Sequence, residues 1–354
     1  MLAGIIDTVH PTFFTGLSSG VLWGLIIAAI LCLVLGADRA VGSAARLAVA
    51  LGINKVIIGA TVVSLGTTLP EACVSVMAAF QGQPGLALGN GIGSVTFNTA
   101  MIFGFCGLFA ALPKDRFLLD RHGWIQLAAA VLLFAICLAI WAVQGDISQV
   151  HLTRPIGLLL VGLLAGYIYK SVRWAKSHPE LVNEEMIDEK VMEGEAPKQA
   201  TGKILTLLVL FAGLALVVAG SELMVGSVQE ISLRYNVPQD IIAVTVVALG
   251  TSLPELVTGI VSLIKGHSEL LVGNVIGANI LNILFVVGVS ATAADLQVGR
   301  AFFWLHMPTM IILLGLVRVF GYTKGPRFRR WHGLPMVAVY GVFVYLAIRF
   351  GILG

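Results

Sequence analysis

The stretch Leu65-Gly66-Thr67-Thr68-Leu69-Pro70-Glu71 recurs 184 residues later as Leu249-Gly250-Thr251-Ser252-Leu253-Pro254-Glu255. Each copy ends in a proline followed by a glutamate, and each lies within a long apolar run. A charged carboxylate at the centre of a membrane costs at least about 2.5–3.5 kcal/mol on insertion scales. A glutamate that occurs twice at matching positions therefore indicates a function.

The repeat extends well beyond this motif. Gly36–Asn98 aligns with Gly220–Asn282 without a gap, and 22 of the 63 pairs are identical. A second shared element follows each glutamate, and its residues are Gly89, Asn90, Ile92, Gly93 and Asn98, repeated as Gly273, Asn274, Ile276, Gly277 and Asn282. The two halves of the chain are thus copies of one unit.

The composition indicates a protein that lies mostly in lipid. Of its 354 residues 58% are hydrophobic and 12% are charged, about half the charged share of a soluble domain, and the mean hydropathy is +0.95. A net charge of +3 is too small to indicate nucleic-acid binding. The cysteines lack CxxC spacing and are interpreted as small packing residues, without disulfides or metal sites; they are Cys32, Cys73, Cys106 and Cys137.

Ten apolar runs are long enough to be membrane spans, which need roughly 20 residues each. Their approximate bounds are 17–36, 55–80, 86–111, 123–143, 155–173, 203–221, 240–265, 270–291, 302–320 and 334–351. An acidic stretch over 176–202 separates the first five from the last five. We expect a first repeat at 1–175, a cytoplasmic linker at 176–202 and a second repeat at 203–354.

The basic residues predict the orientation of these spans. Of the 22 Lys and Arg residues, 18 fall at the ends of odd-numbered spans, and only Arg154, Arg234, Arg300 and Arg349 lie on the other side. We expect a multi-pass protein of the cell membrane. The positive-inside rule places its linker in the cytoplasm and both termini outside. Because each copy has an odd number of spans, the second must be upside down relative to the first. The predicted fold is an all-α membrane protein of ten helices in two inverted five-helix repeats.

The repeated motif also provides oxygen ligands. Pro70 and Pro254 lack an N–H, which leaves the carbonyls of Gly66 and Gly250 without helical partners. Free carbonyls at membrane depth are tolerated where they line a wet cavity or bind a ligand. With Glu71, Glu255 and the hydroxyls of Thr67, Thr68, Thr251 and Ser252, they form a set suited to a hard cation such as Ca²⁺.

The asparagines of the second element have two interpretations. Asn98 and Asn282 are favoured to face the glutamates. For Asn90 and Asn274, a structural role as a cap or interhelical bond is as plausible as a ligand role.

These motifs resemble the α-repeats of the calcium/cation antiporter superfamily, in particular its prokaryotic sodium/calcium exchangers. The resemblance implies that Glu71 and Glu255 bind both Ca²⁺ and Na⁺, and that the carbonyls of Thr67 and Thr251 complete the calcium shell. It further implies sodium sites formed by the Ser64 and Ala248 carbonyls with Thr68, Ser252 and Ser94, and a central place for Asn98 and Asn282.

Three residues depart from the family pattern. Val95 stands where the family usually has Asn, Ala278 where many members have Ser, and Asn282 where some have Asp. The first two affect the expected sodium affinity or stoichiometry, and the third leaves two formal negative charges at the site.

The function expected from these residues is exchange of Ca²⁺ for Na⁺ by alternating access, with spans 1 and 6 sliding as gates and no resident cofactor. Proton-coupled exchange is the alternative, because two glutamates also bind two protons. An enzyme is not expected, since His306, the histidine deep in a span, has no Ser or Cys partner and no HExxH motif. His306 is interpreted as a packing or hydrogen-bonding residue, and the equivalent Asp38 and Glu222 as interfacial anchors.

Overall fold

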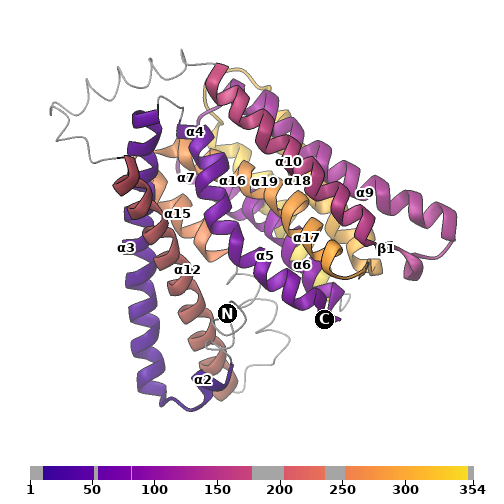
Figure 1. Cartoon of the computed structure of the whole chain (residues 1–354), viewed down its shortest axis with the longest axis horizontal. Helices are drawn as coiled ribbons and strands as arrows, with labels where there is room; N and C mark the ends of the chain where they lie inside the picture. Colours follow the sequence, from indigo (N-terminus) through magenta and orange to yellow (C-terminus); the bar gives the residue numbers. More distant parts are fainter. Residues whose placement is uncertain (1–10, 52–54, 81, 178–202, 236–251, 350–354) are drawn as a thin grey trace.

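The computed structural model describes residues 11–51, 55–80, 82–177, 203–235 and 252–349. Ten helical segments run through these ranges, one at each predicted span (Figure 1). The first five are α3 (Ser19–Leu51); α4 (Lys55–Ile58) with η2 (Gly59–Val63) and α5 (Ser64–Phe80); α6 (Pro84–Phe97) with η3 (Asn98–Phe105) and α7 (Cys106–Phe109); α8 (Arg116–Leu118) with η4 (Leu119–Gly123) and α9 (Trp124–Gln144); and α10 (Arg154–Ser177).

The second half repeats this order. Its segments are α12 (Lys203–Arg234); α15 (Leu253–Ile264); α16 (Ser268–Leu281) with η7 (Asn282–Val286) and α17 (Val287–Ala293); η8 (Phe302–His306) with α18 (Met307–Gly321); and α19 (Gly333–Arg349). Most of the first half of predicted span 7 lies outside the described residues. Shorter elements are α2 (Pro11–Thr15), η5 (Ile147–Gln149), η9 (Arg330–His332), β1 (His151–Leu152) and β2 (Leu296–Gln297).

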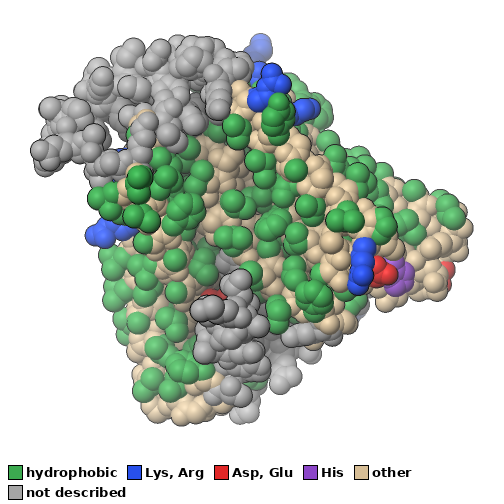
Figure 2. Space-filling model, viewed as in Figure 1, with side chains coloured by type: hydrophobic (Ala, Val, Ile, Leu, Met, Phe, Trp, Pro, Cys, Tyr) green, Lys and Arg blue, Asp and Glu red, His purple; other side chains and the backbone are tan. Residues whose placement is uncertain are grey.

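The helix lengths are those of a multi-pass membrane protein. Seven described helices are long and apolar enough to cross a membrane, and the bent pair Gly59–Leu69 and Glu71–Phe80 makes an eighth. The bend is 43° and falls at Pro70, where the backbone lacks its N–H. Hydrophobic side chains cover the middle of the face in Figure 2, while the few charged ones gather toward its margins.

Two predicted spans are too short. Spans 1 and 6 were expected to end at 36 and 221, but α3 continues to Leu51 and α12 to Arg234. Polar residues after position 36 set the predicted end of span 1, whereas one face of the helix stays apolar and buried beyond it. The buried residues of that face are Ala37, Ala40, Val41, Ala44, Ala45, Leu47 and Ala48.

Helices α3 and α12 form a closely packed pair. Gly36 and Gly213 meet so tightly that a Cβ on Gly36 would lie 2.8 Å from the Gly213 carbonyl oxygen. Gly220 approaches Ala29 and Leu33 of α3 in the same manner. The main buried apolar cluster contains no residue of α3 or α12, whose buried side chains form three smaller clusters, one of them together with Ile58, Val63 and Leu270 of neighbouring helices. The pair is therefore distinct from the remaining helices, which form the core of the protein.

Two backbone links tie the repeats together at matching places. β1, which follows α9, pairs antiparallel with β2, which follows α17. A bridge between Pro113 and Arg327 joins the loop after α7 to the loop after α18. The first link joins the connection after the fourth segment of repeat one to the connection after the third segment of repeat two. The second link joins the connection after the third segment of repeat one to the connection after the fourth segment of repeat two. The repeats are thus related by a two-fold exchange. Sequence analysis had not predicted either link.

Candidate cation site between two broken helices

Glu71 and Glu255 meet inside the core. Glu71 lies on α5 just after the bend, and Glu255 lies on the first turn of α15. Both side chains have 0% exposure, and the two carboxyl groups are close enough to interact electrostatically. The Thr68 hydroxyl spans the two helices, 3.4 Å from Oε1 of Glu255. The inverted repeat thus brings the two carboxylates to one place.

Serine and threonine hydroxyls surround this pair. Ser252, at the start of α15, donates a hydrogen bond to Ser94 of α6, with 3.1 Å between the hydroxyl oxygens. Thr67 donates to the Ser64 carbonyl at 3.2 Å, and the side chains of both are fully buried. Five of the predicted hydroxyl and carbonyl residues therefore lie buried around the glutamates: Ser64, Thr67, Thr68, Ser94 and Ser252. Thr251 and Ala248 lie outside the described residues.

Asn98 and Asn282 occupy matching junctions between helix types. Each is the residue at which an α-helix becomes a π-helix, α6 to η3 and α16 to η7. Extra residues of this kind inside α-helices are frequent at functional sites. Both side chains are fully buried, and neither has a hydrogen-bond partner in the described structure.

Unpartnered oxygen atoms concentrate at this place. Both carboxylate oxygens of Glu71, Oε2 of Glu255 and the Oδ1 atoms of Asn98 and Asn282 are buried without partners among the described residues. Buried polar atoms are normally hydrogen-bonded, and leaving one unpaired costs about 1–3 kcal/mol or more for a charged group. A bound cation would satisfy several of these oxygens at once. The described residues contain no cluster of three His, Cys, Asp or Glu, so the remaining ligands would be neutral oxygens.

Asn90 and Asn274 make the interhelical hydrogen bonds that their structural interpretation predicts. Asn90 donates from Nδ2 to the main-chain oxygen of Glu71 and to the Ser75 hydroxyl, at 2.9 Å each. Asn274 donates to the Thr258 hydroxyl at 3.3 Å, and Thr258 lies 3.1 Å from the Glu255 carbonyl. Both asparagines thus support the helical turn that carries a glutamate.

Sequence analysis missed one buried polar residue, Gln126, which bonds an asparagine of α16. Asn279 of α16 donates to Thr99 of η3 at 3.0 Å and to Gln126 of α9 at 3.1 Å. Gln126 has 0% exposure within an otherwise apolar run. A polar side chain inside a span is the signal that could have identified it.

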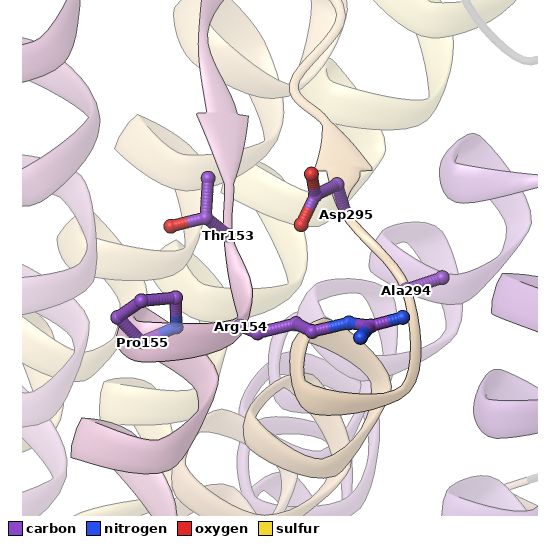
Figure 3. A pocket seen from close by; sticks show the side chains of 5 residues that line it. All are labelled: Thr153, Arg154, Pro155, Ala294 and Asp295. Carbon is purple, nitrogen blue, oxygen red and sulfur yellow. The ribbon is translucent and has the colours of Figure 1, made fainter.

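Other candidates lie elsewhere. His306 packs between the rings of Phe302 and Phe343, at 4.6 and 5.0 Å, with no hydrogen-bond partner in the described structure. Its described contacts are thus packing contacts, as the interpretation of His306 as a packing or hydrogen-bonding residue allows. A surface pocket is lined by Thr153, Arg154, Pro155, Ala294 and Asp295, none of which belongs to the predicted site (Figure 3).

An all-helical membrane protein with two buried carboxylates and unpartnered oxygens, where a bent helix meets the start of another, is a cation transporter in its architecture. The sodium/calcium exchanger protein family matches residues 21–173 and 205–349. The chain belongs to this family. It is therefore a cation exchanger and not an enzyme, as predicted.

Individual relatives agree over nearly the whole chain. The putative antiporter CaxA of Alkalimonas amylolytica is 31% identical over 326 residues, which cover 91% of this chain and 97% of CaxA. The sodium/calcium exchanger MaX1 of Methanosarcina acetivorans is 27% identical and covers 90% of this chain and 96% of its own length. A solved structure of the sodium-calcium exchanger NCX_Mj superposes with a TM-score of 0.76 at 25% identity, covering 93% of this chain and 99% of NCX_Mj. The predicted fold class is confirmed.

Proposed function

We propose that this protein is a secondary active antiporter that exchanges Ca²⁺ for Na⁺ at one shared site between Glu71 and Glu255. One observation carries the proposal: two fully buried carboxyl groups lie together with unpartnered oxygens. Two negative charges balance one Ca²⁺, and the surrounding hydroxyl and carbonyl oxygens suit its preference for 6–8 oxygen ligands. The name of MaX1, a sodium/calcium exchanger, supports the same pair of ions.

The ligand set remains the one predicted from the sequence. Glu71 and Glu255 would bind both ions, and the carbonyls of Thr67 and Thr251 would complete the calcium shell. The sodium ligands would be the Ser64 and Ala248 carbonyls with Thr68, Ser252 and Ser94, and Asn98 and Asn282 would contact the central ion. The burial of those that lie in the described residues supports this assignment.

Obligatory exchange would follow from the charge of the site. Two unneutralised carboxylates buried in a low-dielectric interior are costly, so the empty site would not change its facing. Occupied by one Ca²⁺ or by several Na⁺ ions, it would reorient. The pair α3 and α12 would slide against the core during this step.

The proposed arrangement in the membrane has both termini outside and the linker 176–202 in the cytoplasm, between repeats at 1–175 and 203–354. The distribution of Lys and Arg supports it. Reporter fusions at residue 190 and at the C-terminus would test it, because one fusion should report cytoplasm and the other the outside.

Uptake of ⁴⁵Ca²⁺ into proteoliposomes loaded with Na⁺ tests the function. We expect Glu71→Gln and Glu255→Gln each to abolish uptake, because one remaining charge cannot balance Ca²⁺. Glu222→Gln is the matched control, since this glutamate is exposed on α12, and it should retain uptake. Sodium-driven uptake that survives in each of the two single Glu→Gln variants would overturn the proposal.

Proton coupling is tested in the same vesicles. The two adjacent carboxyl groups could each take a proton, so an imposed pH gradient without Na⁺ should be compared with a Na⁺ gradient at equal pH. Uptake driven by Na⁺ alone supports the proposal, whereas uptake driven only by the pH gradient would replace Na⁺ with H⁺.

A further inference from the structure

We propose that Asp38 and Lys265 form a latch that holds the α3–α12 pair in one of its two positions against the core. Lys265 would be a positioning residue that biases which side of the membrane the cation site faces. The proposal rests on the alternating access proposed above and adds the contact that sets its bias.

The ion pair joins the two bodies of the protein. Lys265 follows directly after α15, the helix that carries Glu255, and Asp38 lies in the middle of α3. Nζ of Lys265 is 2.7 Å from Oδ1 of Asp38 and 3.0 Å from its main-chain oxygen. Within the part of the chain that the structure describes, the other ion pairs are internal to α12 (Glu230–Arg234) or to the core (Asp120–Arg318). Asp38 is thus partnered with the core, and the anchoring role expected for it was incomplete.

The contact is specific to one register of α3. Gly42, one turn beyond Asp38, lies beside the ammonium, because a Cβ there would be in ordinary contact at 3.5 Å from Nζ of Lys265. The same point is 3.5 Å from a guanidinium nitrogen of Arg46, the next residue along this face. A slide of about one turn, 5.4 Å, would bring Gly42 and the Arg46 guanidinium beside it to the ammonium, and so replace the attraction of Asp38 with repulsion between two cations. A slide the other way would bring Val34 to the ammonium.

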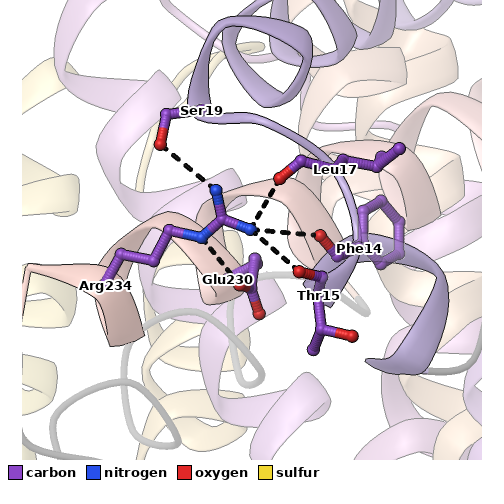
Figure 4. A network of polar contacts seen from close by, with 6 residues as sticks. All are labelled: Phe14, Thr15, Leu17, Ser19, Glu230 and Arg234. Carbon is purple, nitrogen blue, oxygen red and sulfur yellow. Dashed lines mark hydrogen bonds and ion pairs between the residues drawn. The ribbon is translucent and has the colours of Figure 1, made fainter.

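The matching positions at the other end of the pair lack an oppositely charged partner in the sequence. The repeat matches Asp38 with Glu222, Gly42 with Gly226, and Lys265 with Gln81, which is uncharged and lies outside the described residues. Gly226 is covered by the ring of Phe14 from α2. Arg234 bonds the carbonyl oxygens of Phe14, Thr15 and Leu17 and so fastens α2 to α12, within the pair (Figure 4). A latch at one end alone would favour one facing of the site.

The test measures the apparent affinity for Ca²⁺ at each face, with right-side-out and inside-out vesicles. A shift in the facing equilibrium raises the affinity on one face and lowers it on the other, because each depends on the fraction of transporters that face that side. Since the ion pair is partly exposed, we expect Lys265→Gln and Asp38→Asn to change the ratio of the two affinities about two- to fivefold. The charge swap Asp38→Lys with Lys265→Asp should restore the ratio.

Two further variants sharpen the result. Gln81→Lys places a cation at the position matching Lys265, where it could pair with Glu222. It should shift the ratio of the two affinities in the same direction as Lys265→Gln, because both variants weaken the preference for the wild-type facing. Arg234→Gln removes an ion pair inside the moving pair and should leave the ratio unchanged. Equal changes on both faces, or no change in Lys265→Gln, would overturn the latch.

A measurement without transport separates this proposal from the function proposed above. Spin labels at Leu35→Cys on α3 and Leu132→Cys on α9, both exposed positions, report the distance between the pair and the core in a background lacking the native cysteines. We expect Lys265→Gln to redistribute two distance populations, even if Ca²⁺ proves not to be the substrate. Identical distributions with and without Lys265 would overturn the latch, whatever ion is exchanged.

Discussion

Nδ2 of Asn90 lies 2.9 Å from the main-chain oxygen of Glu71, so a side chain on α6 holds the backbone of the residue that presents a carboxylate on α5. The contact falls just after the bend at Pro70, where the helix has lost an internal hydrogen bond. The same amide nitrogen reaches the Ser75 hydroxyl one turn later. Asn90 therefore fixes the turn that aims Glu71 at the site.

Asn90→Asp removes both donated bonds and sets a carboxylate oxygen against the Glu71 carbonyl oxygen, which can only accept. We expect the apparent affinity for Ca²⁺ to fall about 10- to 100-fold, the usual effect of losing a group that orients a metal ligand. Initial rates of ⁴⁵Ca²⁺ uptake over a range of Ca²⁺ concentrations measure it. Asn274→Asp is the comparison, because Asn274 acts on Glu255 only through Thr258, and its effect should be smaller. Equal effects would contradict this order.

The bond between Ser252 and Ser94 predicts a selective sodium defect. Neither hydroxyl belongs to the proposed calcium shell, and both belong to the proposed sodium set. Ser94→Ala should raise the Na⁺ concentration for half-maximal exchange about fivefold, which corresponds to one net hydrogen-bond energy of about 1 kcal/mol. The apparent affinity for Ca²⁺ should stay within twofold. Ser290→Ala, a buried serine on α17, is the control, and a larger effect on Ca²⁺ than on Na⁺ would reject the assignment.

Gly277 allows α16 to touch the helix that precedes Glu71. A Cβ at Gly277 would overlap the Ala60 backbone and lie 2.6 Å from the Ser64 hydroxyl oxygen. Gly277→Ala should therefore destabilise the protein by about 1–3 kcal/mol, the usual cost of overpacking, and lower its thermal unfolding midpoint in detergent. At Gly162, an exposed glycine of α10, a Cβ would have no atom of the described residues within 4 Å, so Gly162→Ala should leave the midpoint unchanged.

The doubled motif allowed much of this architecture to be predicted. A charge and a proline at matching places in two apolar runs are rare, so Glu71, Glu255 and the inverted plan follow from the sequence. The ends of α3 and α12 do not, because hydropathy averages over a helix and Asp38, Arg39 and Arg46 outweigh its buried apolar face. The partner of Asp38 could not be predicted either, since Lys265 is 227 residues away and only the packing of α3 against α15 brings them together.

The partner of a buried amide was also beyond sequence analysis. Asn279 of α16 matches Val95 of α6, so one repeat has an amide where the other has an isopropyl group. The structure explains the amide, because Nδ2 of Asn279 bonds Gln126 of α9 and Thr99 of η3. The partner Gln126 lies outside the aligned segment, so the repeat itself carries no trace of it.

This network predicts a non-additive pair of substitutions. Asn279→Val leaves Gln126 buried without its partner and should cost about 1–3 kcal/mol of stability, seen as a lower thermal midpoint in detergent. Gln126→Leu should cost less, because Asn279 keeps Thr99 as a partner. Combining the two replaces both polar groups with apolar ones and should recover most of the loss, since removing both partners of a buried bond is nearly neutral. Additive losses would show that the two amides do not depend on each other. If the double variant also retains Na⁺-driven Ca²⁺ uptake, the network supports the packing of α9 against α16 and takes no part in binding the ion.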